Sequence, residues 1–192
     1  MNKGISNFYW SHLVGVQCVL DLGCYTGDLG KFKPADVAMY GLDSNKAAID
    51  IAKKHYTEAQ VWDLDQPQPL PYADNFFDAV VAKDILEHLQ KPWELLKEVK
   101  RVVRPGGKVL ASVITHRSKR TWSDYTHVRG FTMQSTQTLF TDNGFQVVAV
   151  WRMGGIPLTA RLDLVKINPL LLKFPLFDWV WTSSYELEAR LK

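Results

Sequence analysis

Acidic residues and glycines recur in the first third of this chain in an arrangement that could bind a nucleotide-type ligand. Asp21, Gly23 and Gly27 lie together in the stretch DLGCYTGD at residues 21–28. Glycines allow the backbone to turn tightly and to approach a ligand without obstruction by a side chain. Asp43 follows Gly23 by 20 positions, and an acid so placed can accept hydrogen bonds from both hydroxyls of a ribose.

Two further acidic positions extend this pattern along the chain. Asp63 follows a third apolar run, where its carboxylate could accept from the exocyclic amine of adenine while Leu64 offers apolar surface. Asp84 follows a fourth apolar run. Each acid alone could equally be a helix cap or a turn former. Their joint occurrence after successive runs favours a ligand site.

Alternating strands and helices must position these residues. Strands are predicted at 16–22, 37–42, 60–62, 77–82, 108–114 and 146–151, and helices at 44–54, 93–103 and 133–143. In residues 184–192 apolar and charged side chains alternate, which predicts a last strand with one solvated face, able to pair antiparallel at the sheet edge. Such alternation is typical of a mostly parallel sheet covered on both sides, with ligands beyond the carboxyl ends of its strands.

The order of these motifs resembles the class I S-adenosylmethionine-dependent methyltransferases, and is closest to their small-molecule type 11 branch. The resemblance covers roughly residues 16–150, and it is carried by VLDLGCYTGDLG at 19–30, GLD at 41–43, DL at 63–64, FDAVVAKDILEHL at 77–89 and RVVRPGGKV at 101–109. It implies an α/β fold, Rossmann-like, with a seven-stranded mostly parallel sheet, helices on both faces and an antiparallel last strand. It also implies an enzyme that uses S-adenosyl-L-methionine as methyl donor.

The resemblance also implies roles for individual residues in binding the cofactor. Asp21 helps to hold the methionine end, Asp43 binds the ribose, and Asp63 with Leu64 binds adenine. The full set of expected cofactor-binding residues is Asp21, Gly23, Tyr25, Gly27, Asp43, Ser44, Asp63, Leu64, Asp84 and His88.

Tyr25 departs from the family pattern, because it stands where the family has the middle glycine of Gly-X-Gly-X-Gly. Its ring must point away from the cofactor or stack against it, and one hypothesis is a cation–π contact near the sulfonium. Tyr25 also disfavours a nicotinamide-dependent oxidoreductase, since the dinucleotide fingerprint needs glycines at positions 25 and 28. A methyltransferase-like binding module without catalytic activity is a further alternative.

Two groups of residues could act on a methyl acceptor. Asp84, Glu87 and His88 would share one face if their turn is helical. Their spacing also suits metal ligands, but the sequence offers no convincing further partner, so no metal site is expected. His88 is expected to close the cofactor pocket or to cap the helix rather than to act in catalysis. In the polar loop 115–131, the carboxylate of Asp124 could orient the ring of His127 to take a proton. We take Asp124 and His127 as the candidate catalytic residues.

The acceptor is expected to be a small molecule methylated on oxygen or nitrogen. Four basic residues make the loop 115–131 locally positive, namely Arg117, Lys119, Arg120 and Arg129. This suggests an anionic acceptor such as a phosphorylated sugar, or else only a solvated loop. A net charge of +3 and the lack of a separate basic domain make nucleic acid an unlikely partner.

The length of 192 residues predicts a single domain. We divide it into an N-terminal lid or helix (1–15), a cofactor-binding core (16–151), a covering or substrate insertion (152–183) and the last strand (184–192). No stretch reaches the length of a membrane span, and the N-terminus lacks the features of a signal peptide, so a cytoplasmic location is expected. Residues 156–181 could contact a membrane surface or cover the sheet. The sequence leaves the oligomeric state open.

Overall fold

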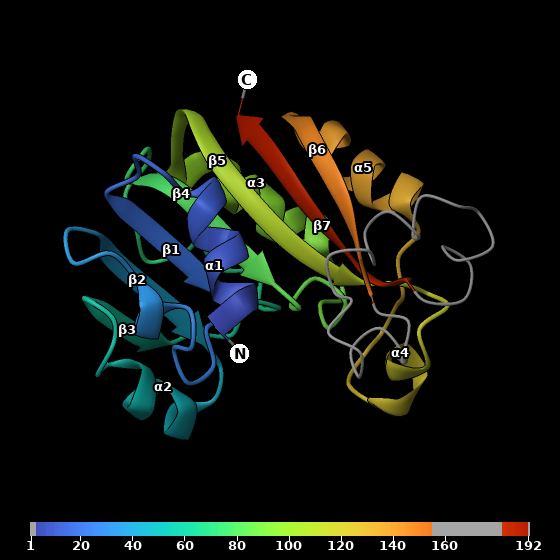
Figure 1. The fold of residues 1–192 in the computed structure, drawn as a ribbon, viewed down its shortest axis with the longest axis horizontal. Helices are drawn as coiled ribbons and strands as arrows, with labels where there is room; N and C mark the ends of the chain where they lie inside the picture. Colours follow the sequence, from blue (N-terminus) through green and yellow to red (C-terminus); the bar gives the residue numbers. More distant parts are fainter. Residues whose placement is uncertain (1–2, 155–181, 192) are drawn as a thin grey trace.

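The computed structural model describes residues 3–154 and 182–191, in which a seven-stranded sheet carries helices on both faces (Figure 1). The strands are β1 (Cys18–Leu22), β2 (Ala38–Asp43), β3 (Glu58–Val61), β4 (Phe77–Lys83), β5 (Val103–Ile114), β6 (Phe145–Gly154) and β7 (Thr182–Leu191). The helices are α1 (Lys3–His12), α2 (Lys46–Ala52), α3 (Pro92–Val102), α4 (Lys119–Ser123) and α5 (Met133–Asp142), with a short 3₁₀ turn η1 (Gly30–Phe32).

The order of the strands creates a crevice in the middle of the sheet. They are arranged β3-β2-β1-β4-β5-β7-β6, and β7 is antiparallel to both of its neighbours. The chain proceeds outward in one direction from β1 to β3 and then returns to the other side of β1 as β4. Ligands of open α/β sheets bind at this kind of switch point, outside the carboxyl ends of the strands. The predicted Rossmann-like class, with an antiparallel last strand, is confirmed.

The last strand differs from the prediction in its place and its burial. It lies inside the sheet between β5 and β6, so the expected edge position is wrong. The expected solvated face is also wrong, because Glu186 and Glu188 are only 7% and 8% exposed. Helix α1 lies against this face, and the Tyr9 hydroxyl donates a hydrogen bond of 2.6 Å to Oε2 of Glu186. The alternating pattern identified a strand but not its surroundings.

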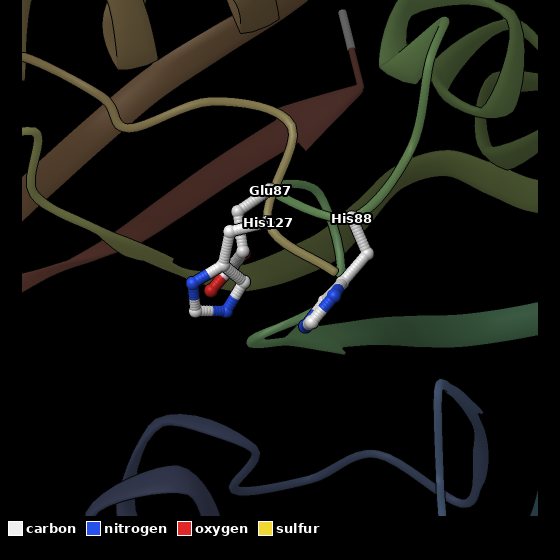
Figure 2. A group of neighbouring side chains, drawn as sticks. All are labelled: Glu87, His88 and His127. Atoms are coloured by element: carbon white, nitrogen blue, oxygen red, sulfur yellow. The ribbon is translucent and has the colours of Figure 1, made fainter. Parts of the chain in front are cut away.

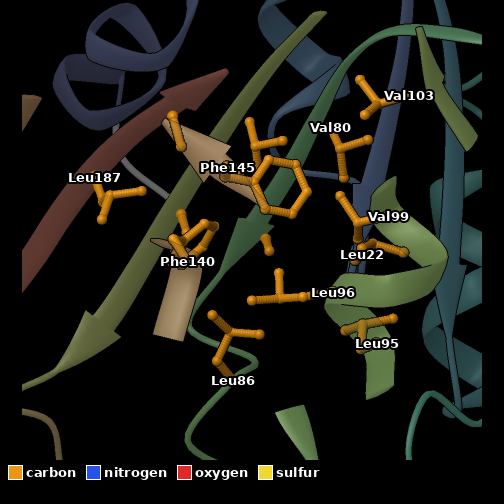
Figure 3. Close-up of a cluster of buried hydrophobic side chains, with 14 of the residues drawn as sticks. Leu22, Val80, Leu86, Leu95, Leu96, Val99, Val103, Phe140, Phe145 and Leu187 are labelled. Atoms are coloured by element: carbon orange, nitrogen blue, oxygen red, sulfur yellow. The ribbon is translucent and has the colours of Figure 1, made fainter. Parts of the chain in front are cut away.

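Two apolar clusters cover the two faces of the sheet. One joins the sheet to α3 and α5 and includes Val80, Leu96 and Phe140 (Figure 3). The other joins the sheet to α1 and α2 and includes Val81 and Ile49. Consecutive residues of β4 thus serve opposite faces, which is why this strand appears in the sequence as a continuous apolar run.

Most predicted elements lie within a few residues of the observed ones. Asn45 caps α2, because its side chain accepts from the Ala48 N–H at 3.1 Å. Strand β5 begins earlier than predicted, since Val103 already pairs with Phe77. Residues 155–181 of the predicted covering insertion lie outside the described residues.

The N-terminal segment predicted as a lid or helix forms α1. Among the helices of the described ranges, none has the length and apolar character needed to cross a bilayer. The cytoplasmic location stays a prediction.

Replacing Tyr9 with phenylalanine should lower the free energy of unfolding by about 1–3 kcal/mol, because the buried Glu186 carboxyl loses a donor while the packing of the ring is kept. Urea denaturation followed by circular dichroism measures this change. The matched control is Tyr125→Phe, at a residue that is 98% exposed, and it should leave stability unchanged. Equal stability of Tyr9→Phe and the parent protein would contradict an anchoring role for this bond.

Candidate functional site

The turn after β1 adopts the backbone conformations that its glycines permit. Gly23 and Gly27 have φ of +72° and +76°, and Tyr25 between them has φ of +47°. Only glycine adopts this left-handed region without cost, and a tyrosine there costs about 1–2 kcal/mol. Tyr25 therefore occupies a position whose backbone suits glycine, in agreement with the departure seen in the sequence. Its side chain is largely exposed.

Asp43 is fixed beside this turn by two backbone donors. The Tyr25 N–H donates to Oδ2 of Asp43 at 2.8 Å, and the Asn45 N–H donates to Oδ1 at 2.8 Å. Each carboxylate oxygen can accept more than one hydrogen bond. The end of β2 thus presents an oriented acid that can also accept from a ribose diol.

Asp21 is buried at the end of β1 and hydrogen-bonded by a residue that the sequence analysis did not single out. The Tyr56 hydroxyl lies 2.5 Å from Oδ2 of Asp21. Burial raises the pKa of Asp21 to about 7, although the Tyr56 hydroxyl and the Lys83 ammonium act to lower it. The Tyr56 ring fits because two glycines leave room: a Cβ on Gly30 or Gly41 would lie 2.1 or 2.5 Å from it.

A cavity of about 290 Å³ lies between the turn after β1 and the end of β4. The predicted site residues that line it are Asp21, Gly23, Tyr25 and Asp84. Asp63 and Leu64 line a separate cavity of about 490 Å³, together with residues at the start of α3. The structure therefore gathers the residues expected at the methionine end, and places those expected at adenine farther along the same edge of the sheet.

A larger cavity of about 840 Å³ adjoins the first one. The two cavities share Ile5, Lys83 and Asp84 in their walls. The larger one is bounded by α1, the end of β4, the loop around α4 and the start of β7. His88, Asp124 and His127 are among the residues that line it. His88 was expected at the cofactor, but it lines the larger cavity and not the smaller one.

Asp84 is held as a carboxylate in the shared wall. Burial is the largest influence on its pKa and raises it. The charge of Lys83 and hydrogen bonds from Lys83 and Ser112 outweigh burial, so the pKa lies below the usual range. The Ser112 hydroxyl donates to Oδ1 of Asp84 at 2.6 Å, and Lys83 pairs with Oδ2. The condition for a shared helical face is not met, because this segment forms a turn in which the His88 N–H donates to the Ile85 carbonyl at 3.0 Å.

Glu87 and His88 instead meet His127 from the loop after α4 (Figure 2). One potential ligand atom from each of the three lies within 4.8 Å of the others, and the two imidazole centroids are 4.5 Å apart. The Val128 N–H donates to the Glu87 carbonyl at 3.0 Å and ties the two loops together. Burial raises the pKa of Glu87 to about 8. His127 is the partner that the spacing of residues 84–88 could not reveal.

The side chains of the predicted pair Asp124 and His127 are adjacent but not hydrogen-bonded to each other, although the His127 N–H donates to the Asp124 carbonyl at 3.2 Å. Oδ2 of Asp124 lies 3.8 Å from Nε2 of His127, beyond hydrogen-bonding distance. The ring is oriented by Thr121 instead, whose carbonyl oxygen lies 3.0 Å from Nδ1. Oδ1 of Asp124 accepts from the Thr126 hydroxyl at 2.6 Å. This arrangement leaves Nε2 of His127 able to accept a proton.

The fold and the crevice define an α/β domain that binds a nucleotide-type cofactor, and comparisons with known proteins identify the family. Residues 20–111 match the family model of the type 11 methyltransferase domain. A ubiquinone biosynthesis O-methyltransferase of Coxiella burnetii is 30% identical over 105 residues, which are 53% of this chain and 45% of that protein. Phosphoethanolamine N-methyltransferase 3 of Arabidopsis thaliana is 31% identical over 147 residues, covering 69% of this chain and 29% of that protein.

The solved structure of a SAM-dependent methyltransferase from Archaeoglobus fulgidus shares the fold, with a TM-score of 0.78 at 18% identity over 98% of this chain and 92% of that one. The present chain spans less than half the length of the two curated relatives. These likenesses support a class I S-adenosylmethionine-dependent methyltransferase, a family whose cofactor is S-adenosylmethionine. They argue against the nicotinamide alternative.

The residues around the smaller cavity fit this cofactor. S-adenosylmethionine carries a positive sulfonium and a positive amino group, and the carboxyls of Asp21, Asp28 and Asp84 border the cavity. Gly23 keeps the backbone close to the space, since an added Cβ would come within 3.0 Å of the Ile85 side chain. Asp43 adds acceptors suited to the ribose.

Replacing Asp21 with asparagine should stabilise the protein more at pH 8 than at pH 5. The folded-state pKa of about 7 lies above the ordinary value of 3.8, so the folded state binds more protons between these values, and Asp21 destabilises the fold increasingly as the pH rises. We expect the difference between variant and parent to shift by on the order of 2 kcal/mol between the two pH values. Urea denaturation at both pH values measures it.

The control for this comparison is Asp36→Asn, because Asp36 is exposed in the loop before β2. It removes an acid from the surface, so the comparison isolates the effect of burial at Asp21. An effect of Asp21→Asn that does not change with pH would show that Asp21 titrates normally.

Proposed function

We propose that this chain transfers the methyl group of S-adenosylmethionine to an oxygen or nitrogen atom of a small molecule held in the larger cavity. The observation that carries the proposal is the wall shared by the two cavities, formed by Ile5, Lys83 and Asp84. A cofactor with its methionine end beside the turn after β1 would present its methyl group across this wall. The names of the two curated relatives, an O- and an N-methyltransferase, support the reaction class.

The chain contributes to such a transfer chiefly through alignment and the exclusion of water. When bound, S-adenosylmethionine supplies a methyl group on a positively charged sulfur. The acceptor needs an in-line approach, and holding both partners in place accounts for much of the acceleration. The buried anchor between Tyr9 and Glu186 holds α1 over the larger cavity. Asp84, kept ionised by Lys83 and Ser112, places a fixed negative charge beside the reacting groups.

An oxygen acceptor must also lose a proton, and His127 is the proposed base. Its Nδ1 faces the Thr121 carbonyl, so the neutral ring carries its proton there and offers the Nε2 lone pair. Asp124, at 3.8 Å from Nε2, would stabilise the imidazolium that forms. A neutral amine acceptor would need no base before the transfer.

The charges that line the larger cavity favour a neutral acceptor. Its ionisable carboxyl and cationic side chains are Asp84, Glu87, Asp124, Glu186, Lys83 and Arg120. Burial raises the pKa of Glu87 to about 8 and also raises the pKa of Glu186. The charges of Asp84 and Asp124 are matched by those of Lys83 and Arg120. The anionic acceptor proposed from the basic loop has less support, because only Arg120 of that basic set lines the cavity.

Replacing Asp43 with alanine should weaken the binding of S-adenosylmethionine at least tenfold, because both the ribose acceptor and the anchor of the Tyr25 N–H are lost. Isothermal titration calorimetry measures the affinity, and Asp36→Ala is the matched control at an exposed position. Circular dichroism checks that the variant is folded. Undiminished binding by Asp43→Ala would mean that the ribose lies elsewhere.

Replacing His127 with alanine should lower turnover about 100-fold and leave the affinity for S-adenosylmethionine unchanged, since the proton acceptor is lost on the acceptor side only. The formation of S-adenosylhomocysteine with a panel of neutral phenols, alcohols and amines measures turnover. His55→Ala, at a histidine outside both cavities, should behave like the parent. Full turnover by His127→Ala would remove His127 from the mechanism. A parent protein that binds the cofactor but methylates no member of a broad panel would favour the inactive binding module.

A further inference from the structure

We propose that Glu87, His88 and His127 bind one divalent transition-metal ion of the Zn²⁺ type in the wall of the larger cavity. The three residues come from two loops that meet only in the fold, the turn after β4 and the loop after α4 (Figure 2). The role of the ion in catalysis rests on the methyl transfer proposed above. Its binding does not, and can be tested separately.

The ring of His127 is held in the tautomer that metals bind. Its Nδ1 lies 3.0 Å from the Thr121 carbonyl oxygen, which can only accept, so Nδ1 carries the proton. Nε2 then has a free lone pair. Metal-bound histidines characteristically donate their other ring N–H to a carbonyl or carboxylate in this way.

The ring of His88 is oriented by a different acceptor with the same result. Its Nδ1 lies 3.0 Å from Oγ1 of Thr126. The proton of that hydroxyl is engaged by Oδ1 of Asp124 at 2.6 Å, so Oγ1 accepts from the imidazole N–H. Both histidines of the cluster therefore offer Nε2 as a ligand.

Glu87 supplies the observation that points to a missing ligand. Its side chain is only 1% exposed, and its Oε2 has no hydrogen-bond partner within the described ranges. A buried carboxyl oxygen without a partner is costly, and native proteins rarely leave one unsatisfied. A potential ligand atom of Glu87 lies within 4.8 Å of one on His127 and one on His88. A cation between these groups would satisfy the oxygen.

The geometry needs only a small adjustment to close around an ion. One potential ligand atom from each residue lies within 4.8 Å of the others, whereas bonds of about 2.1 Å in a tetrahedral site place donors roughly 3.4 Å apart. Rotations of the side chains that move each donor by about 1 Å close this gap. Two imidazoles and one carboxylate suit Zn²⁺-type ions, since Mg²⁺ and Ca²⁺ prefer oxygen ligands alone.

Such an ion would have an open position toward the acceptor, and this selects an oxygen nucleophile. A hydroxyl bound there would release its proton to water more readily, because the cation stabilises the oxyanion. The oxygen then forms the new bond to the methyl carbon while the carbon–sulfur bond breaks, and that electron pair stays on sulfur. His127 would serve as a ligand in this arrangement rather than as the base.

The test is metal binding by the whole chain, freed of metal with a chelator and without cofactor or acceptor. We expect calorimetry with Zn²⁺ to show one site per chain, and Co²⁺ to give the visible absorption of a four- or five-coordinate ion. Glu87→Gln, His88→Ala and His127→Ala should each weaken Zn²⁺ binding at least tenfold. Thr126→Val, which removes the acceptor that orients His88, should weaken it about tenfold or more.

The matched controls are His55→Ala and His116→Ala, at histidines outside the cluster, which should bind Zn²⁺ like the parent protein. Circular dichroism identifies any variant that fails to fold, and Thr126→Val together with the Co²⁺ spectrum then decides the matter. The inference is overturned if Zn²⁺ does not bind at one site per chain. It is also overturned if none of the four variants weakens Zn²⁺ binding.

The outcome for the metal is separable from the outcome for methyl transfer. Suppose that protein freed of metal with a chelator binds S-adenosylmethionine and methylates acceptors at the parental rate. This result would refute the catalytic role of the ion and leave the proposed function standing. A protein that binds Zn²⁺ at these residues but neither binds S-adenosylmethionine nor yields S-adenosylhomocysteine would refute the proposed function and support the metal site.

Discussion

The site of this domain depends on the parallel pairing of β1 and β4 in the centre of a sheet that is buried on both faces. This pairing brings two chain segments, about 60 residues apart, to one crevice. Because apolar packing on both faces fixes the strands, the loops at their carboxyl ends can adopt costly conformations. Tyr25 and Asp84 both have positive φ, at +47° and +50°, directly beside that crevice. The rigid core thus stabilises an arrangement that the loops alone would not adopt.

The acidic groups around the crevice differ in their pKa values and hydrogen-bond partners, and these differences follow from their surroundings. Asp84 is ionised because a cation and a hydroxyl donor compensate its burial. Asp21 lies deeper, and one phenol donor does not offset burial, so its pKa rises to about 7. Asp43 receives two backbone N–H groups. One edge of a sheet therefore combines carboxyl groups of different charge, as a site for a large cofactor with charged and uncharged parts requires.

Much of the fold could be predicted from the sequence, because its signals are local. Strands buried on both faces appear as apolar runs, and the glycines and acids that end them mark the carboxyl edge. The position of β7 could not be predicted in this way. Glu186 and Glu188 look solvated in the sequence, but both are buried, and Tyr9 of α1, near the other end of the chain, donates to Glu186.

The residues of the candidate site could likewise be predicted where the signal is local, and not where it depends on tertiary contacts. The residues at the ends of β1, β2 and β4 were identified from spacing, since each lies next to its strand. The meeting of Glu87 with His127, and that of Tyr56 with Asp21, depends on tertiary contacts between segments that carry no common motif. Asp124 and His127 were correctly expected to be neighbours. Their side-chain hydrogen bonds go to Thr126 and Thr121 instead, because the short turns of that loop offer closer partners.

The slot that holds the Tyr56 ring has a consequence for how this sequence can change over evolutionary time. The ring fills the space left by Gly30 and Gly41, and its hydroxyl reaches Asp21. A larger residue at either glycine would expel the ring, and a smaller residue at position 56 would open a void behind the cofactor. A substitution at one of these positions therefore requires compensating substitutions at the others. Among homologues they should covary as a block, even though only Asp21 of the four lines the cavity beside the turn after β1.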